Sequence, residues 1–292
     1  MRAIAYAKVN LSLRVGALRS DGYHPLQSLF QSVTLGDRLE LTVPPGGADD
    51  DGIVGWDGEQ VPDDHRNLAW LAVEAVRQRM AAEATPLRLR LDKQIPVAAG
   101  LGGGSADAAA ALHLAVRRLG ADPALVAELA PELGSDVPFC AVGGTAMVTG
   151  RGETLDRLEP LTGFALGLVV PPVELSTPAV FREWDRLGGP AGPETPSGGL
   201  PPAVRTYAPL VNDLYPAAVS LMPELEDWRH ELQQRWERPV TMSGSGPTLF
   251  GWFVDLAEAE SALAVAPTGA RATHAVLPVD RGWIEEALPD PT

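Results

Sequence analysis

Residues 93–120 read KQIPVAAGLGGGSADAAAALHLAVRRLG, and this stretch decides the fold. Four glycines, Gly100 and 102–104, stand directly before an alanine-rich segment. Because alanine favours helix and glycine permits unusual backbone conformations, the pattern predicts a glycine loop that opens a helix. The free N–H groups and the dipole at a helix start favour an anion. Taken alone, the same loop is also typical of a flexible connector.

Two familiar phosphate-binding motifs do not match this loop. A Walker loop ends in Gly-Lys-Ser/Thr, whereas Gly104 is followed by Ser105 and Ala106. A dinucleotide-binding fingerprint that starts at Gly100 needs a glycine where Ser105 stands. If the loop binds phosphate, it must do so with main-chain N–H groups in place of a lysine.

The composition limits the class of protein. The 292 residues are 45% hydrophobic, which predicts a globular chain with room for one large domain or two ordinary ones. A formal net charge of -15 argues against nucleic acid and anionic membranes as partners. Cys140 is the only cysteine, which excludes a disulfide framework and fits a reducing compartment. With no signal-peptide pattern and no apolar run of about 18 residues, we expect a cytoplasmic protein whose oligomeric state stays open.

The basic residues are almost all arginines. Of the 23 basic residues, only Lys8 and Lys93 are lysines. A codon bias explains the arginine background, but it makes the two lysines candidates for roles that need a compact ammonium group.

Periodicity predicts strands and helices along the first half of the chain. Alternating apolar residues predict strands at 11–15, 38–43 and 87–93, and a helical period predicts helices at 67–81, 104–119 and 123–133.

The pattern restarts after residue 155. Strands are predicted at 164–170, before Met242, at 248–254 and at 272–279, with helices at 178–187, 224–237 and 256–265. The Gly/Pro-rich segment 188–202 is predicted to be a flexible surface loop. This order indicates an α+β protein with two domains, 1–157 and 158–292, the second an α/β sandwich.

Three further segments accompany the glycine loop. They read AKVNLSLRVGALRSDGYHPLQSLFQSV at 7–33, GSDVPF at 134–139 and MSGSGPTLFG at 242–251. Together with the loop they resemble, in order and over nearly the whole chain, the motifs of the GHMP kinases. These small-molecule kinases are named for galactokinase, homoserine kinase, mevalonate kinase and phosphomevalonate kinase. The DGYH block is similar to the branch that uses ATP to phosphorylate the 2-hydroxyl of a cytidine diphosphate-linked methylerythritol in the non-mevalonate isoprenoid pathway.

The resemblance implies a fold and a nucleotide site. It implies a ribosomal-protein-S5-like N-terminal domain and a ferredoxin-like C-terminal domain. ATP is expected over the loop, where the glycines let phosphates approach the main chain, so a β-branched residue at Gly103 should obstruct it. The implied ATP-binding residues are Asn67 and Leu68 at the adenine, Lys93 nearby, and Pro96, Val97, Ala98, Ala99, Gly100, Leu101, Gly102, Gly103, Gly104, Ser105 and Ala106.

The resemblance also implies the catalytic pair. Phosphoryl transfer to an alcohol needs a carboxylate that takes the proton and a cation that screens charge. Asp136 matches the base, and Lys8 matches the ammonium group that orients the hydroxyl. Asn10 is expected on the same strand face as Lys8, and the resemblance implies that it contacts the substrate. Taken alone, Asp136 would be a helix cap or turn residue and Lys8 a solvated surface residue.

The implied cytidine site draws on both halves of the chain. Tyr23 and His24 of the DGYH block and Phe181 of the second domain match residues that hold the base. Taken alone, the aromatics would be core residues and His24 a turn residue. Thr177, Gly244 and Ser245 are further expected substrate contacts.

Some expectations remain open at this stage. Many relatives carry a second serine and an asparagine where this chain has Ala106 and Asp107, which leaves Ser105 as the better candidate to help place Mg²⁺ or a phosphate. Mg²⁺ is implied by the use of ATP, but no carboxylate cluster identifies its ligands. Another GHMP kinase, or an inactive nucleotide-sensing protein with the same fold, remains an alternative.

Overall fold

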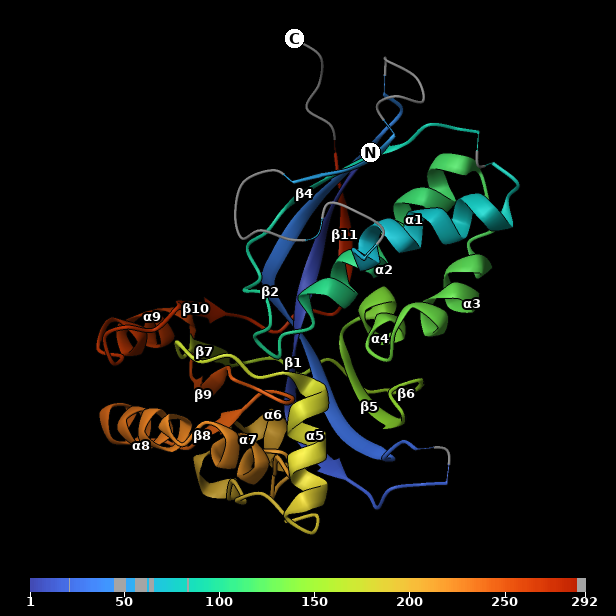
Figure 1. Cartoon of the computed structure of the whole chain (residues 1–292). Coiled ribbons are helices and arrows are strands. Elements are labelled where there is room, and N and C mark those ends of the chain that lie inside the picture. The colour runs from blue at the N-terminus through green and yellow to red at the C-terminus, as the bar shows by residue number, and fades with distance from the viewer. Residues whose placement is uncertain (21, 45–50, 56–61, 63–65, 83, 288–292) are drawn as a thin grey trace.

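The computed structural model describes residues 1–20, 22–44, 51–55, 62, 66–82 and 84–287. Two β-sheets with helices packed against them make up this part of the chain (Figure 1). The mixture of helices and strands confirms the predicted α+β class. Within the described residues, no helix combines the length and the apolar character that crossing a membrane requires.

The first sheet is built around two long strands. Its strands are β1 (Arg2–Val15), β2 (Leu26–Thr42), β3 (Gly52–Gly55), β4 (Arg88–Asp92), β5 (Thr145–Gly150), β6 (Thr154–Arg157) and β11 (Trp283–Glu286). They run in the order β11-β1-β2-β4-β3, and β5 pairs with both β2 and β6. All pairs are antiparallel except β3 with β4. Because β2 has 17 residues, its start pairs with β5 and its end with β4.

Four helices cover one face of this sheet (Figure 1). They are α1 (Leu68–Arg79), α2 (Gly103–Leu119), α3 (Ala124–Leu133) and α4 (Val137–Val142). The central helix α2 contacts the other three as well as β1 and β2. Its alanines 108–111 are fully buried. Such small side chains let α2 lie close to the sheet, which places its glycine-rich start beside β1.

The strand predicted at 11–15 is only the last part of β1. Ala3, Ala5 and Ala7 are fully buried on the helix-covered side of the strand, but apolar Ile4 and Tyr6 stand between them. The apolar–polar alternation is therefore hidden in the sequence. The pairing of β1 with β2 is irregular between Tyr6 and Lys8, and β-bulges of this kind often re-aim a side chain beside an active site.

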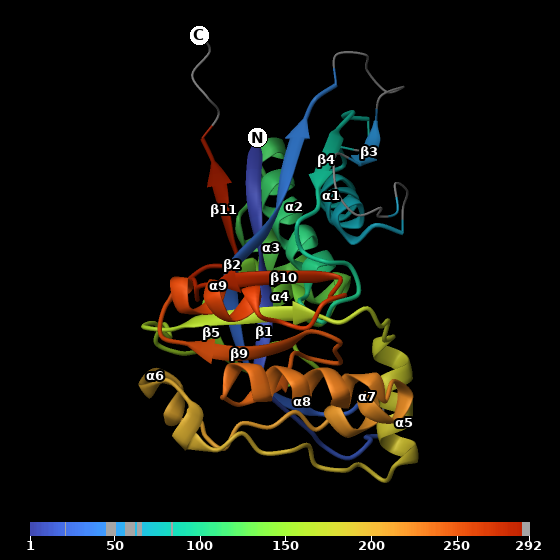
Figure 2. The ribbon, with the colours of Figure 1, turned by 90° about the vertical axis from the view of Figure 1, so that its left-hand side faces the viewer.

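The second sheet has the strand order β10-β7-β9-β8 and is antiparallel throughout. Its strands are β7 (Ala165–Val170), β8 (Val240–Met242), β9 (Leu249–Phe253) and β10 (Ala272–Val276). The associated helices are α5 (Thr177–Arg186), η2 (Ser197–Gly199), α6 (Pro202–Arg205), α7 (Tyr215–Leu221), α8 (Glu224–Trp236) and α9 (Leu256–Ala264). Helices α8 and α9 pack along the sheet (Figure 2). This arrangement confirms the predicted ferredoxin-like sandwich.

Several elements are absent from the sequence prediction, namely β3, β5, β6, α4, η2, α6, α7 and β11. The last of these, β11, pairs with β1 from Arg2 opposite Glu286 to Ala5 opposite Trp283. The expected boundary after residue 157 falls between β6 and β7. Nevertheless, the chain expected to form the second domain returns one strand to the first sheet.

The segment 188–202 is irregular, as predicted, but it is not a free surface loop. Thr195 exchanges backbone hydrogen bonds with Leu210, and the indole N–H of Trp184 donates to the carbonyl of Pro190 at 2.9 Å. Leu200 is only 2% exposed. The segment forms little regular structure beyond the turn η2, and these contacts fix it against the second domain.

Candidate active site

A cavity of about 840 Å³ lies between the two halves of the molecule. Nearly all of the residues that the sequence singles out line it: Lys8, Asn10, Tyr23, His24, Asn67, Leu68, Lys93, the loop 96–105, Asp136, Thr177, Phe181, Gly244 and Ser245. Ala106 is the exception, because it is fully buried in the core. The structure thus brings four separate sequence motifs to one site; Asp21 of the DGYH block lies outside the described residues.

The glycine loop needs glycine at two positions for steric reasons. Gly100 and Gly102 have φ angles of 76° and 70°, which residues with a side chain rarely adopt. A Cβ atom at Gly100 would lie 2.6 Å from the carbonyl oxygen of Ser243, and one at Gly102 would lie 2.8 Å from Cγ of Lys8. The loop therefore passes directly over Lys8, and a larger residue at 102 would displace that side chain.

Helix α2 starts within the cavity wall without a side-chain cap. Its N-cap residue is Gly102, and its first turn carries no acidic residue. The N–H groups of Gly103, Gly104 and Ser105 belong to this first turn, which leaves them without intrahelical acceptors. The helix start is therefore suited to an anion.

Gly103 does not face the cavity, contrary to the expectation that a side chain at this position would obstruct ATP. A Cβ atom there would point into the protein, 3.0 Å from Cγ2 of Ile95. At Gly104, by contrast, the only neighbour within 4 Å among the described residues would be Cδ1 of Leu68, at 3.8 Å. Because Leu68 also lines the cavity, Gly104 is the position where a side chain would enter it.

Lys8 and Asp136 form an ion pair on the cavity wall. Nζ of Lys8 lies 3.2 Å from Oδ2 of Asp136. The lysine side chain is 6% exposed and the aspartate side chain 30%, so the carboxylate is the more accessible partner. Asp136 stands at the N-cap position of α4, but its side chain makes no capping hydrogen bond. The carboxylate is thus directed to the cavity instead of the helix end.

Asn10 and Ser28 hold the ammonium group of Lys8. Nζ of Lys8 donates to Oδ1 of Asn10 at 2.6 Å, which confirms that the two residues share a strand face. Nδ2 of Asn10 donates to Oγ of Ser28 at 2.9 Å, and Ser28 donates to the carbonyl of Ser12 at 2.5 Å. Because the Ser28 hydroxyl is committed as a donor, the amide of Asn10 must turn its oxygen toward Lys8.

Segment 242–251 of the second domain supports the glycine loop. Oγ of Ser243 accepts the backbone N–H of Asn10 at 3.1 Å and donates to the carbonyl of Gly100 at 3.0 Å. Oγ1 of Thr248 donates to the carbonyl of Ala99 at 2.6 Å. These bonds join β1, the loop and the turn after β8, which fixes the loop relative to Lys8.

The expected adenine residues lie at the start of α1. Oδ1 of Asn67 caps the helix by accepting the N–H of Ala69, and its Nδ2 donates to the carbonyl of Pro62, each at 2.9 Å. Asn67 therefore has a structural role at the start of α1. Leu68 is partly exposed beside Gly104.

An aromatic cluster lines the other part of the cavity. The rings of His24 and Phe181 stack with centroids 5.7 Å apart, and Trp184 meets His24 edge-on at 5.2 Å. Nδ1 of His24 donates to the carbonyl of Gly16 at 2.9 Å, and Nε2 lies 3.2 Å from Oδ2 of Asp185. The two ring nitrogens thus hold the histidine between Gly16 and helix α5.

Tyr23 and Thr177 complete this part of the cavity. Tyr23 is 54% exposed, and the guanidinium of Arg151 lies 4.8 Å from its ring centroid. The hydroxyls of Thr177 and Ser245 are 2.8 Å apart, which links α5 to the turn after β8. Both domains therefore contribute to the cavity.

Sequence reasoning missed several lining residues. Phe30 lies under the ammonium of Lys8, with Nζ 4.8 Å from the ring centroid, and Arg151 covers Tyr23. Phe30 belongs to the quoted segment 7–33, which could have drawn attention to it. Arg151 lies in the turn between β5 and β6, and nothing in its local sequence indicates a site.

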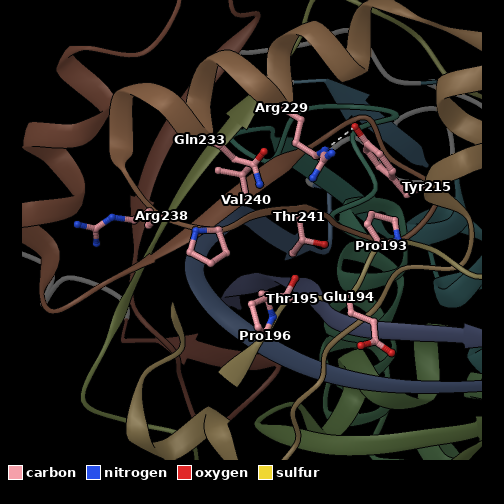
Figure 3. A pocket seen from close by; sticks show the side chains of 11 residues that line it. Pro193, Glu194, Thr195, Pro196, Tyr215, Arg229, Gln233, Arg238, Val240 and Thr241 are labelled. Carbon is pink, nitrogen blue, oxygen red and sulfur yellow. Dashed lines mark hydrogen bonds between the residues drawn. The ribbon is translucent and has the colours of Figure 1, made fainter. Parts of the chain in front are cut away.

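A second cavity, of about 250 Å³, lies in the second domain between segment 193–196, α8 and β8 (Figure 3). Its residue Arg229 donates from Nε to the hydroxyl of Tyr215 at 2.8 Å and from Nη2 to Glu226 at 2.8 Å. Burial and the Glu226 carboxylate raise the pKa of Tyr215, so its hydroxyl stays protonated. Because Arg229 is already paired and none of the expected residues lies here, the larger cavity is the candidate site.

The carboxylates around the larger cavity are few. Asp107 and Asp136 are the only acidic residues among the described ones that line it, and the described residues hold no group of three or more potential metal ligands. Mg²⁺ that is bound to nucleotide phosphates needs only one or two protein ligands. The site therefore fits a metal ion that arrives with a nucleotide, with Asp136 and Ser105 as the available oxygen donors.

Comparison with known proteins identifies the family. Residues 67–144 match the GHMP kinases N terminal domain, and residues 205–270 match GHMP kinases C terminal. A 4-diphosphocytidyl-2-C-methyl-D-erythritol kinase of Pelotomaculum thermopropionicum is 40% identical over 94% of this chain and 96% of its own. The kinase of the same name from Cutibacterium acnes is 42% identical over 83% of this chain and 82% of its own.

Solved structures agree with this result. A crystal structure of 4-(cytidine 5'-diphospho)-2C-methyl-D-erythritol kinase matches with a TM-score of 0.78 and 33% identity, over 95% of this chain and 99% of that one. A homoserine kinase from Cytophaga hutchinsonii, at 18% identity, shares the fold with a TM-score of 0.67 over 97% of this chain and 96% of that one. The expected two-domain fold is thereby confirmed, and the chain belongs to the GHMP kinases and, among them, to the 4-diphosphocytidyl-2-C-methyl-D-erythritol kinase family.

Proposed function

We propose that the protein transfers the γ-phosphoryl group of ATP to the 2-hydroxyl of 4-diphosphocytidyl-2-C-methyl-D-erythritol, with Asp136 as the base. The observation that carries this proposal is the ion pair of Lys8 and Asp136, which lies in one cavity with the glycine loop and the aromatic cluster. The family membership supports the choice of both substrates.

The nucleotide lies over the glycine loop in this proposal. The N–H groups at the start of α2 bind the phosphates, and the adenine lies near Leu68 and Asn67. These donors supply positive potential without a Walker lysine. Mg²⁺ accompanies the nucleotide and screens the charge of its phosphates.

The acceptor alcohol lies beside Asp136. Its proton passes to the carboxylate as its oxygen bonds to the γ-phosphorus, while the bond from that phosphorus to the bridging oxygen of ADP breaks. Lys8 stabilises negative charge near the transferred group, and Asn10 and Ser28 hold the ammonium in place. The roles of these residues are electrostatic and positional, as expected for phosphoryl transfer.

The cytosine lies at the aromatic cluster, with Phe181 and Tyr23 as the stacking residues. Nδ1 of His24 is bonded to the carbonyl of Gly16, so Nε2 is the ring nitrogen that meets the base once the base replaces Asp185. Thr177, Gly244 and Ser245 lie on the path between this end and Lys8, where they contact the rest of the substrate.

The function is tested by ADP release in a coupled assay. We expect ADP release to depend on 4-diphosphocytidyl-2-C-methyl-D-erythritol and to stay at the buffer level with homoserine or mevalonate. Equal stimulation by homoserine or mevalonate would support another GHMP kinase activity. Absence of turnover with every alcohol, in protein that binds ATP, would support a nucleotide sensor.

Replacing Gly104 by valine is expected to raise the KM for ATP by about tenfold or more, which corresponds to about 1.4 kcal/mol of binding free energy. The new side chain enters the cavity beside Leu68, where it competes with the nucleotide. The KM for the alcohol should change much less. Gly198→Val is the control, because a Cβ there meets no atom of the described residues within 4 Å and lies outside the cavity. If Gly104→Val raises both KM values equally in folded protein, the loop has a structural role only.

A further inference from the structure

Lys93 is the centre of a buried charge cluster behind the glycine loop. Its ammonium group contacts Oδ2 of Asp37 and lies 2.7 Å from Oδ2 of Asp107. The side chains of Lys93, Asp37 and Asp107 are 4%, 0% and 4% exposed. Lys93 lies at the cavity wall, but its ammonium is already bound by two carboxylates. It is therefore poorly placed to serve as a free cation for a nucleotide.

The cluster connects both ends of the glycine loop. Asp37 lies on β2, and its Oδ1 accepts the backbone N–H groups of Gln94 at 2.6 Å and Ile95 at 2.8 Å, just before the loop begins. Asp107 lies on α2, two residues after the loop ends at Ser105. Lys93 joins the two carboxylates, so a single ammonium group links β2, the entry to the loop and the first turns of α2.

This cluster is not expected to contribute much to the free energy of folding. Two buried carboxylates share one ammonium group, and the cost of removing charges from water often exceeds the attraction gained. Burial raises the pKa of Asp107 well above its usual range. The ammonium of Lys93 opposes this rise, and the carboxylate of Asp37 adds to it. Among the described residues, no donor reaches Oδ1 of Asp107. Apolar side chains of similar size often replace a buried ion pair without loss of stability, so the pairing of Lys93 with Asp107 points to a geometric role.

We propose that Lys93, Asp37 and Asp107 are positioning residues that set the place of the glycine loop and the first turn of α2 for the ATP phosphates. Lys93 acts through the loop: its Nζ is 3.3 Å from the place of a Cβ on Gly103, on the protein side of the main chain. Because ATP is the ligand in question, this inference rests on the proposed function.

The first test uses Asp37, which does not line the cavity and so cannot contact the nucleotide. Asp37→Asn puts an amide in place of a carboxylate that accepts from Lys93 and from two backbone N–H groups. We expect the Kd for a fluorescent ATP analogue and the KM for ATP to rise about tenfold, while the KM for the alcohol changes less than about threefold. A lower Tm with unchanged ATP affinity would overturn the inference.

The second test compares two replacements of Asp107. Asp107→Ala removes the link between α2 and Lys93, and we expect the same rise of about tenfold in the Kd for the ATP analogue. Asp107→Asn keeps an oxygen acceptor for Lys93 in the same volume, so it should restore the Kd to within about threefold of the original protein. Equal affinities of the alanine and asparagine variants would overturn the proposed link.

Arg77→Met provides the matched control. Arg77 is also buried, with a side chain 5% exposed, and pairs with Asp51 at 2.9 Å and Glu74 at 2.8 Å, but it lies outside the cavity. Its loss should lower the Tm and leave the ATP affinity unchanged. A weakened ATP affinity in Arg77→Met would show that any buried ion pair has this effect and would count against the inference. The binding assay needs no alcohol, so failure of the inference is separable from a wrong acceptor; absence of ATP binding in the original protein would contradict the proposed function instead.

Discussion

Replacing Asp136 by asparagine is expected to lower kcat by roughly 10² to 10⁴, with the KM values for both substrates nearly unchanged. The amide has almost the same size, so the cavity keeps its shape. It cannot accept the proton of the alcohol, and it removes the negative charge that forms an ion pair with the ammonium of Lys8, 3.2 Å from the carboxylate in the original protein. Single-turnover measurements with both substrates bound report the chemical step directly.

The ion pair predicts how a second change combines with the first. Lys8→Met should also lower kcat strongly, and the double variant should be little worse than the poorer single variant, because the two groups act as a unit. Asp156→Asn, an exposed position on β6, is the control and should leave kcat unchanged. A loss of less than about tenfold in Asp136→Asn would remove Asp136 from the role of base.

Replacing Phe181 by alanine is expected to raise the KM for the cytidylyl substrate by roughly 5- to 150-fold. Stacking of one base on an aromatic side chain contributes about 1 to 3 kcal/mol, and about 1.4 kcal/mol corresponds to a factor of ten. Phe181 is half-buried and already stacks on His24, so the ring is oriented before the base arrives. The KM for ATP should stay close to that of the original protein.

Val180 offers a control on the same helix. It is fully buried in the second core and does not line the cavity, so Val180→Ala should lower folding stability by about 2 kcal/mol without a change in substrate KM. If Phe181→Ala instead lowers the Tm with no change in KM for the cytidylyl substrate, Phe181 is a core residue and the choice of substrate reopens.

Local patterns in the sequence were sufficient for several features. The glycine run followed by alanines predicts the loop and helix α2, because backbone freedom and helix propensity are properties of neighbouring residues. The order of elements after residue 157 predicts the second sandwich for the same reason. Asp136 was singled out only because its motif resembles that of a family, whereas Lys8 was also marked as one of only two lysines.

Other features of the structure could not be predicted from local patterns in the sequence. The Asn67 side chain caps helix α1, and segment 188–202 packs against the second domain, although composition indicates a free loop. Likewise, apolar residues on both sides of β1 hide its first half, because periodicity reveals a strand only when one of its faces is polar.

By itself, the sequence determined many of the helices and strands, the two-part α+β organisation and the residues most worth testing. Only the tertiary structure decided which of these residues meet. Ser243 reaches Gly100 across 143 positions, and Lys93 pairs with Asp37 across 56. Strand β11 likewise returns from the C-terminal region to pair with β1. The physical reason is that periodicity and propensity report whether a residue is buried and in which element, whereas its partner is set by how the elements pack together.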